Sequence, residues 1–360
     1  MTVPTELFRC LRVPCQVLGL AAVLALGACG GGDRENEFQP ARVIVFGDEA
    51  SVVVPAAIPA SGATPAIPAG SRYTVNGFTT TTDSTTTPPT TTTVFDCNVN
   101  RIWVQQLAFR AGFGLPGCLR TGETSTTSLN YAEAGTGVAG VRAQIDTHLL
   151  TDTFAPSDLV TVYTGQKDVI DIYATVTTAA ECRFDADDPT TAGPIAQEAR
   201  RRGGVLAAQV NRIANGGRGG RVLFVTVPSV GSTPFGRLPN DKAGVERDTC
   251  LEQLTAAFNA GLRTETLQDG RYVGLLQLDE RIGAALRGFY GFANLVDPVC
   301  RSDAPLPACT TETLIDPDSD PDTDTAHTTY LWADDLHFGV TMHNVLGSLA
   351  INRAFETNPF

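Results

Sequence analysis

Short apolar runs alternate along the chain with longer segments of helical periodicity. The runs cover residues 42–46, 128–132, 159–164, 221–227 and 272–278, as buried parallel strands would. The helical segments cover residues 138–150, 192–213, 241–267, 281–289 and 338–355. This alternation predicts an α/β fold, a three-layer α/β/α doubly wound parallel sheet. Ligands of such sheets bind outside the carboxyl ends of the strands, so candidate chemistry is expected there.

Two segments depart from this alternation. Residues 79–93 are nearly all Thr, and we expect them to form an exposed excursion that does not pack. Residues 316–324 read DPDSDPDTD. Carboxylates suit calcium, but the Gly and the distal Glu of an EF-hand loop are missing, so we interpret this segment as a solvated loop and leave calcium binding open.

The beginning of the chain reads as an export signal. Residues 1–28 contain Arg9 and Arg12, followed by an apolar run that is too short to span a bilayer. The run ends in Leu26-Gly-Ala-Cys29, which resembles the lipobox of bacterial lipoproteins, where a lipid is attached to the cysteine. An ordinary signal peptide with an incidental cysteine is the alternative.

The lipobox resemblance implies three parts of the chain. After the signal we expect the lipidated Cys29 with a flexible Gly-rich tether over 29–40, and then one folded domain over 41–360. The protein would be exported and lipid-anchored, at the outer membrane facing the periplasm or at the cell surface.

Composition narrows the possible partners. The 360 residues carry a net charge of −13, and the pI is about 4.7, so the chain repels the phosphate backbone and nucleic acid is not an expected partner. A content of 42% hydrophobic and 18% charged residues excludes wholesale disorder. We expect no cofactor, and a membrane partner only through the lipid.

Six cysteines remain after the signal and Cys29. An even number in an exported chain predicts disulfides. We expect nearest neighbours to pair, although sequence alone allows other connectivities: Cys97 with Cys118, Cys182 with Cys250, and Cys300 with Cys309. A zinc site is the alternative, but the chain has no C-x₂-C pair with a nearby His.

Four short blocks along the chain resemble sequence blocks of one known enzyme family. The first, Phe46-Gly-Asp-Glu-Ala-Ser51, resembles the nucleophile block F-G-D-S-x-S. The others are similar to N-Y-A-x-G-G, G-x-N-D and D-x-x-H, and they are Asn130-Tyr-Ala-Glu-Ala-Gly135, Gly165-Gln-Lys-Asp168 and Asp334-Asp-Leu-His337. The four blocks, in this order, resemble those of the SGNH, or GDSL, hydrolases. This resemblance implies an SGNH fold with sheet order 2-1-3-4-5 and an ester-hydrolase ancestry.

The resemblance also assigns roles. In this family a Ser attacks the ester carbonyl, a His accepts its proton and an Asp orients the His. His337 and Asp334 match the last two, and Gly135 matches the glycine whose N–H belongs to the oxyanion hole. Two positions depart from the family: Glu49 stands in place of the nucleophilic Ser, and Lys167 in place of the oxyanion Asn.

The two departures are interpreted together. Because both positions flank one oxyanion site in the family, we expect Glu49 and Lys167 to form a charge-compensated pair that plugs it. The alternative is that both side chains face solvent and the site has decayed. Ser51 matches the second Ser of the block, where a capping role is expected, and it remains an alternative nucleophile.

The remaining histidines lack the spacing of metal ligands. We expect structural roles for His148, His327 and His343, and no metal site.

Three functions stay open. The preferred one is a cell-envelope lipoprotein of the GDSL family that has lost its serine chemistry and retains a cleft for acyl-ester or glycan ligands. The second is an active ester hydrolase with a rearranged site, using Ser51, or Glu49 as a base, with His337. The third is a structural or partner-binding envelope protein that uses loops such as 79–93. The sequence does not define the substrate or ligand.

Overall fold

The computed structural model describes three stretches of the chain: 38–62, 65–315 and 326–356. They belong to one compact unit that extends over Phe38–Phe360. The predicted signal with Cys29, most of the tether and the acidic segment 316–324 lie outside the described residues.

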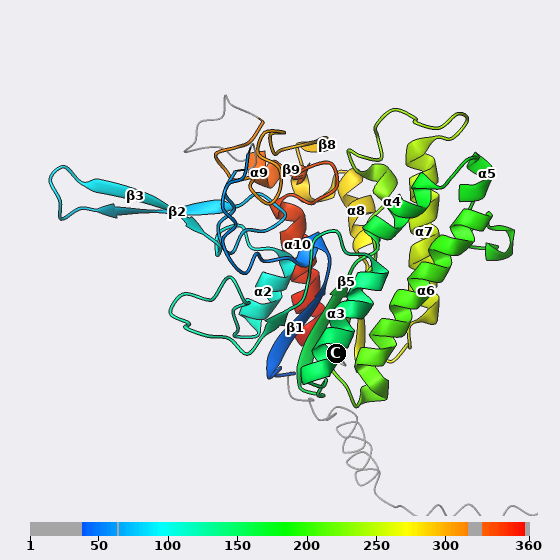
Figure 1. The fold of residues 1–360 in the computed structure, drawn as a ribbon, viewed down its shortest axis with the longest axis horizontal. Coiled ribbons are helices and arrows are strands. Elements are labelled where there is room, and N and C mark those ends of the chain that lie inside the picture. The colour runs from blue at the N-terminus through cyan, green and yellow to red at the C-terminus, as the bar shows by residue number, and fades with distance from the viewer. Residues whose placement is uncertain (1–37, 63–64, 316–325, 357–360) are drawn as a thin grey trace, which may run out of the picture. The chain divides into compact units, whose positions relative to one another are not determined.

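A five-stranded parallel sheet forms the centre of this unit (Figure 1). Its strands are β1 (Arg42–Gly47), β4 (Leu129–Asn130), β5 (Asp158–Tyr163), β6 (Arg221–Val225) and β7 (Val273–Leu276). They lie in the order β4-β1-β5-β6-β7 and are all parallel. By order of appearance this is 2-1-3-4-5, so the predicted fold class and strand order are confirmed. β1 lies next to the switch in strand order, where doubly wound sheets place their ligands.

Helices cover both faces of the sheet because the strand side chains alternate between two cores. Ile44 and Phe46 belong to the core under one helical layer, whereas Val43 and Val45 belong to the core under the other. The first layer contains α3 (Val138–Thr151), α4 (Gln166–Ala174), α6 (Pro194–Ala214) and α7 (Arg247–Glu265). The second contains α2 (Trp103–Arg110), α8 (Leu278–Leu286) and α10 (Val340–Ile351).

Smaller elements connect these layers. Two short helices, α5 (Ala179–Cys182) and α9 (Ala326–Thr329), and a two-stranded parallel sheet of β8 (Asn294–Pro298) and β9 (Tyr330–Trp332) are formed. The single-turn elements are η1 (Glu49–Ser51), η2 (Pro189–Thr191), η3 (Asn215–Gly217), η4 (Val230–Ser232), η5 (Phe289–Gly291) and η6 (Asn352–Glu356). Within the described residues, no helix combines the length and the apolar character needed to cross a membrane.

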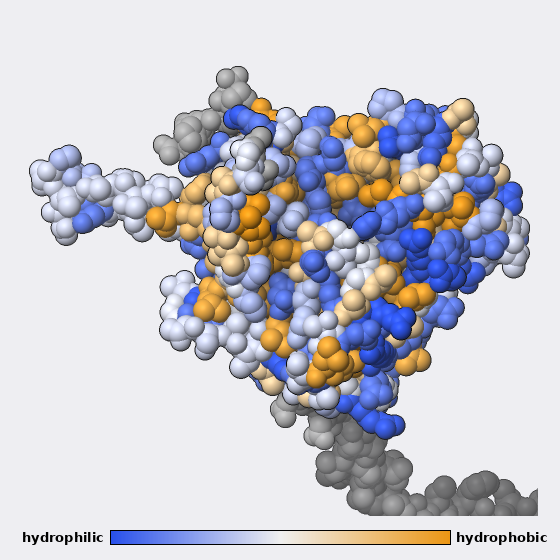
Figure 2. All heavy atoms as spheres, in the orientation of Figure 1, coloured by the Kyte–Doolittle hydropathy of each residue, from blue (hydrophilic) through white to orange (hydrophobic). Residues whose placement is uncertain are grey.

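The Thr-rich segment is more ordered than expected. β2 (Gly77–Asp83) and β3 (Thr90–Asp96) pair antiparallel as a hairpin, from Gly77 opposite Asp96 to Asp83 opposite Thr90. β-branched Thr favours the extended backbone, and Thr80 and Thr93 place their hydroxyls 3.0 Å apart across the strands. The hairpin is exposed, as predicted, and projects as a polar arm (Figures 1 and 2).

Three disulfides join the pairs expected from the sequence: Cys97–Cys118, Cys182–Cys250 and Cys300–Cys309. The nearest-neighbour prediction is therefore confirmed. Cys182 ties α5 to α7, whereas the other two bonds tie down loops at the hairpin's base and beyond β8.

Candidate functional site

The turn after β1 places Asp48 and Glu49 at the carboxyl end of a central strand. Gly47 adopts φ +158°, and a Cβ there would come within 2.4 Å of the Tyr163 carbonyl oxygen, so only Gly fits. Gln144 on α3 clamps this glycine, since its Oε1 accepts from Gly47 N–H and its Nε2 donates to Gly47 O, both at 2.9 Å. The Asp48 carboxylate then caps η1 by accepting from Ala50 N–H at 3.2 Å.

A second loop, after β4, meets this turn. Asn130 donates from Nδ2 to the Ser51 carbonyl at 3.1 Å and accepts from Ala132 N–H at 3.0 Å, which fixes the loop against η1. Gly135 follows with φ +73°, a conformation natural to Gly. Its N–H donates to Oε1 of Glu49, with an N···O distance of 2.5 Å. The backbone donor that the sequence assigns to the oxyanion hole is thus bound to a carboxylate of the chain itself.

The turn after β9 presents His337 and Asp334. One Asp334 oxygen, Oδ1, accepts from the backbone N–H groups of Leu336 (2.9 Å) and His337 (2.7 Å). Oδ1 and Oδ2 also lie 2.8 and 2.9 Å from Nδ1 of His337. This arrangement fixes the imidazole orientation and leaves Nε2 without a hydrogen-bond partner among the described residues.

Charge around the imidazole favours its protonated form. Burial disfavours the imidazolium, but the Asp334 carboxylate, followed by Glu49 and Asp48, outweighs it and raises the pKa of His337 above 6.5. Conversely, burial opposes ionisation of Asp334, but its hydrogen bonds to His337 and the backbone hold its pKa below 3.8. Glu49 therefore acts electrostatically on His337 although no ion pair joins them.

Asp48 lies beneath this surface and is only 5% exposed. Burial, followed by repulsion from Glu49, raises its pKa to about 8. Asp48 is consequently a neutral acid below about pH 8.

Tyr73 lies against the imidazole, and nothing in the sequence indicated it. The Tyr73 and His337 rings are 5.6 Å apart at 48°. Thr74 fixes this contact by donating to the Phe338 carbonyl at 3.0 Å. No motif could have identified Tyr73, because its contact with His337 joins segments far apart in the chain.

Buried polar groups hold the Tyr73 segment on either side. Arg72 donates to the carbonyls of Cys97 and Val99, and Asn76 donates to the carbonyls of Pro307 and Cys309. Burial lowers the pKa of Arg72 to about 9. Arg72 and Asn76 each bind a segment that contains a disulfide-bonded cysteine. The Cys97–Cys118 and Cys300–Cys309 bonds therefore support the position of Tyr73.

The expected ion pair between Glu49 and Lys167 is not formed. Lys167 lies in the first turn of α4, and its Nζ is 2.6 Å from Oδ2 of Asp171, one helical turn later. Both side chains are about half exposed, at 45% and 49%. A pair at this spacing on a helix surface avoids desolvation, whereas Glu49 is satisfied by Gly135 N–H. Glu49 therefore has Gly135 N–H as its hydrogen-bond partner, whereas Lys167 has Asp171.

The other residues of the matching blocks have structural contacts. Ser51 is fully buried, and its Oγ has no hydrogen-bond partner among the described residues. Asp168 accepts from Val138 N–H at 2.8 Å, which caps α3, and Arg202 lies 3.3 Å from its other oxygen. Gln166, which the sequence did not single out, donates to the Leu336 carbonyl at 3.0 Å beside His337.

The other described histidines take part in none of the site contacts described above. His148 and His343 are buried in the two cores, and burial lowers the pKa of His343 to about 3. In the part of the chain that the structure describes, no three or more His, Cys, Asp or Glu side chains gather as metal ligands.

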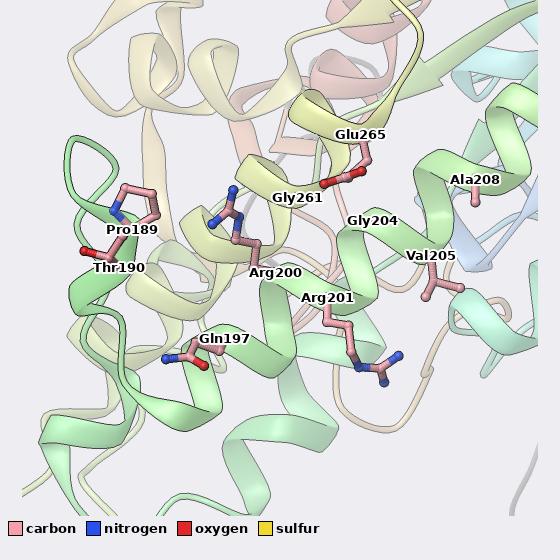
Figure 3. A pocket seen from close by; sticks show the side chains of 10 residues that line it. All are labelled: Pro189, Thr190, Gln197, Arg200, Arg201, Gly204, Val205, Ala208, Gly261 and Glu265. Atoms are coloured by element: carbon pink, nitrogen blue, oxygen red, sulfur yellow. The ribbon is translucent and has the colours of Figure 1, made fainter.

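A separate cavity of about 680 Å³ opens in the first helical layer (Figure 3). Its walls come from α6, α7 and the turn at Pro189, and they include Arg200, Arg201 and Glu265. None of the residues that line it belongs to the Glu49–His337 site.

Comparisons with known proteins add a fold likeness. The sequence matches no protein family and no curated protein. The structure is similar to that of a member of the lipolytic protein G-D-S-L family from Veillonella parvula DSM 2008, at 11% identity and a TM-score of 0.38, over 86% of this chain and 96% of that one. The assignment of the site rests on the contacts described above.

Proposed function

We propose that this protein is an SGNH/GDSL-type cell-envelope lipoprotein that has lost acyl-serine ester hydrolysis. One observation carries the proposal: Oε1 of Glu49 accepts from Gly135 N–H at the position where an ester's oxyanion would need that donor. Glu49 thereby stands in the place of the nucleophilic hydroxyl, and its carboxylate also occupies the N–H that an oxyanion would need. Ser51 offers no hydroxyl in exchange, because it is fully buried.

The same edge of the sheet retains the groups of a ligand site. His337, oriented by Asp334, and the half-buried carboxylate of Glu49 lie at the carboxyl ends of the strands. This placement supports binding of a polar group attached to an acyl or glycan ligand.

An esterase assay tests the loss of activity. The purified protein should not turn over p-nitrophenyl acetate or butyrate above the rate of a His337→Ala variant. Turnover that His337→Ala abolishes would contradict the proposal and favour an active hydrolase.

Export and lipid attachment form a separate part of the proposal. The N-terminal motif supports it, and three disulfides suit an oxidising compartment. Metabolic labelling with a fatty acid should mark the wild-type protein, and Cys29→Ala should abolish the label. Cys15→Ala, within the predicted signal, is the matched control and should still give labelled protein. Label that persists in Cys29→Ala would contradict the anchor.

A further inference from the structure

We propose that Glu49, His337 and Tyr73 form a site that hydrolyses aliphatic epoxides to vicinal diols through a covalent ester on Glu49. This inference uses the same site as the proposed function and adds a reaction to it. Carboxylates serve as covalent nucleophiles in enzymes when a neighbouring group can later release the ester.

The Glu49 carboxylate has the disposition of a nucleophile. One oxygen, Oε1, is held by Gly135 N–H, whereas Oε2 has no hydrogen bond from a described residue. The side chain is half-buried and Gly135 is exposed, so solutes can reach the carboxylate. A nucleophile fixed through one oxygen attacks through the other without first having to be oriented.

The hydrogen bond to Gly135 selects the kind of carbon that can be attacked. Attack on an ester carbonyl needs an oxyanion donor, and Glu49 already occupies the Gly135 N–H. Attack on a saturated carbon develops no oxyanion at that carbon and needs no such donor. Its product is an ordinary alkyl ester of Glu49, which water can cleave.

The second step gives the other groups their roles. His337 Nε2 takes a proton from water, and the hydroxide adds to Cδ of Glu49. Gly135 N–H then stabilises the oxyanion that forms on Oε1. Collapse breaks the bond between Cδ and the ester oxygen, and the departing alkoxide receives the proton from His337. The carboxyl group is regenerated and the diol is released.

Tyr73 selects an epoxide among electrophiles at saturated carbon. Its ring packs on His337, and its hydroxyl makes no hydrogen bond to a described residue. When Oε2 opens the epoxide, the C–O bond breaks and the ring oxygen takes the Tyr73 proton. His337 returns a proton to the Tyr73 phenolate before the second step, and the carboxylic acid formed in that step gives its proton to His337, which restores the starting state. An alkyl halide, by contrast, leaves as an anion and needs no acid.

The charges of the site change in the direction that the reaction requires. Burial, followed by Glu49, raises the pKa of Tyr73, which keeps the hydroxyl protonated as an acid. The negative charge of Glu49 also helps to raise the pKa of His337. Esterification removes that charge, and the Tyr73 phenolate that packs on the imidazolium takes its proton, so the imidazole is neutral at the step where it must act as a base.

Mass spectrometry of the full protein incubated with propylene oxide tests the covalent step. His337→Gln should accumulate one epoxide equivalent on Glu49, because the ester forms but is not hydrolysed. In water enriched in heavy oxygen, a single turnover of the wild type should label the Glu49 carboxylate before the diol. Glu49→Gln should give neither adduct nor diol, whereas Glu133→Gln, on the same loop, is the matched control and should behave as wild type.

Propyl bromide separates the role of Tyr73 from a structural one. Tyr73→Phe should slow alkylation by propylene oxide by ~10²-fold or more and leave alkylation by propyl bromide unchanged. Equal loss with both reagents would overturn the role of Tyr73 as an acid.

Two outcomes would overturn the covalent mechanism as a whole. They are a folded His337→Gln protein without adduct on Glu49, and heavy oxygen that enters the diol directly. The esterase assay is independent of both, so failure of this inference and failure of the proposed function are distinguishable.

Discussion

The N–H of Gly135 donates to Oε1 of Glu49 at 2.5 Å, so the donor that the proposed function assigns to an oxyanion is bound by a side chain of the protein. The hydrogen bond joins the turn after β1 to the loop after β4, two segments that pair through neighbouring strands. One side chain at the end of a strand therefore supplies both a charge and the group that binds this N–H. Charge compensation by a lysine is not needed, because the charged oxygen is hydrogen-bonded and reaches solvent.

Replacing Glu49 by Ser should restore weak ester hydrolysis. Glu49→Ser frees Gly135 N–H and places a hydroxyl beside His337, but the second oxyanion donor is still missing, which typically lowers the rate by ~10²–10³-fold. Hydrolysis of p-nitrophenyl acetate should become measurable, and adding Lys167→Asn should increase it. His337→Ala in the same background is the control. Unchanged background rates in the folded double variant would show that the site needs more than these two groups.

Glu49 and Lys167 should contribute independently to stability. Lys167 pairs with Asp171, and exposed pairs at this spacing stabilise a helix by ~0.3–0.5 kcal/mol. A double-mutant cycle with Glu49→Ala and Lys167→Ala should give a coupling free energy near zero. The same cycle with Lys167→Ala and Asp171→Ala should give a small favourable coupling, which serves as the positive control. Coupling of ~1 kcal/mol or more between Glu49 and Lys167 would restore the ion-pair interpretation.

The sequence predicts most of this architecture because the fold depends on local patterns. The apolar run at Arg42–Gly47 and the helical periodicity at Val138–Thr151 reflect the two cores on either side of the sheet. Even the Thr-rich segment is exposed as expected, although β-branching makes it a hairpin rather than an irregular loop.

The contacts of the site depend on distances that no motif contains. Lys167 occupies the Asn position of its block, but its partner is set by helical spacing to Asp171 and not by the block. Tyr73 reaches His337 only because Thr74 bonds to Phe338 across more than two hundred residues of chain. Such pairings become visible only when the loops are folded.

Removing disulfides should separate general stability from the position of Tyr73. Loop-closure entropy predicts a loss of ~4 kcal/mol for Cys182–Cys250 and ~3 kcal/mol for Cys300–Cys309, whose sequence separations are 68 and 9. We expect paired Ser variants to follow this order in denaturant unfolding. The Cys300→Ser, Cys309→Ser protein should also show increased mobility of the Tyr73 ring by NMR, because Asn76 bonds to the Cys309 carbonyl. The Cys182→Ser, Cys250→Ser protein is the control and should leave that ring unchanged.

His337 and Asp334 should stabilise the fold most in a mildly acidic window. The raised pKa of His337 gives a contribution that is complete below pH 6.5 and is lost as pH rises through its folded pKa. The lowered pKa of Asp334 gives one that is complete above pH 3.8 and is lost as pH falls through its folded pKa. Both are therefore complete between pH 3.8 and 6.5. NMR titration of His337 should give a pKa above 6.5, and Asp334→Asn should lower it. A pKa that Asp334→Asn leaves unchanged would contradict this coupling.

Asp48 should make the protein less stable as the pH rises from 3.8 to about 8. Its carboxyl group has a pKa of about 8 when folded, against 3.8 when unfolded. Between these values the unfolded chain releases a proton that the folded chain retains, so the free energy of unfolding falls by ~1.4 kcal/mol per pH unit from this group. Asp48→Asn is neutral, and its Oδ1 can still accept from Ala50 N–H, so this slope should disappear.

Urea unfolding from pH 4 to 8 should show the variant gaining stability over the wild type as pH rises, by several kcal/mol (~1.4 per unit). Ser51→Ala, buried in the same turn, is the matched control and should run parallel to the wild type. Since the His337 contribution changes only above pH 6.5, a difference in slope between wild type and Asp48→Asn from pH 4 to 6 belongs to Asp48, and parallel curves for the two proteins would show that Asp48 ionises normally.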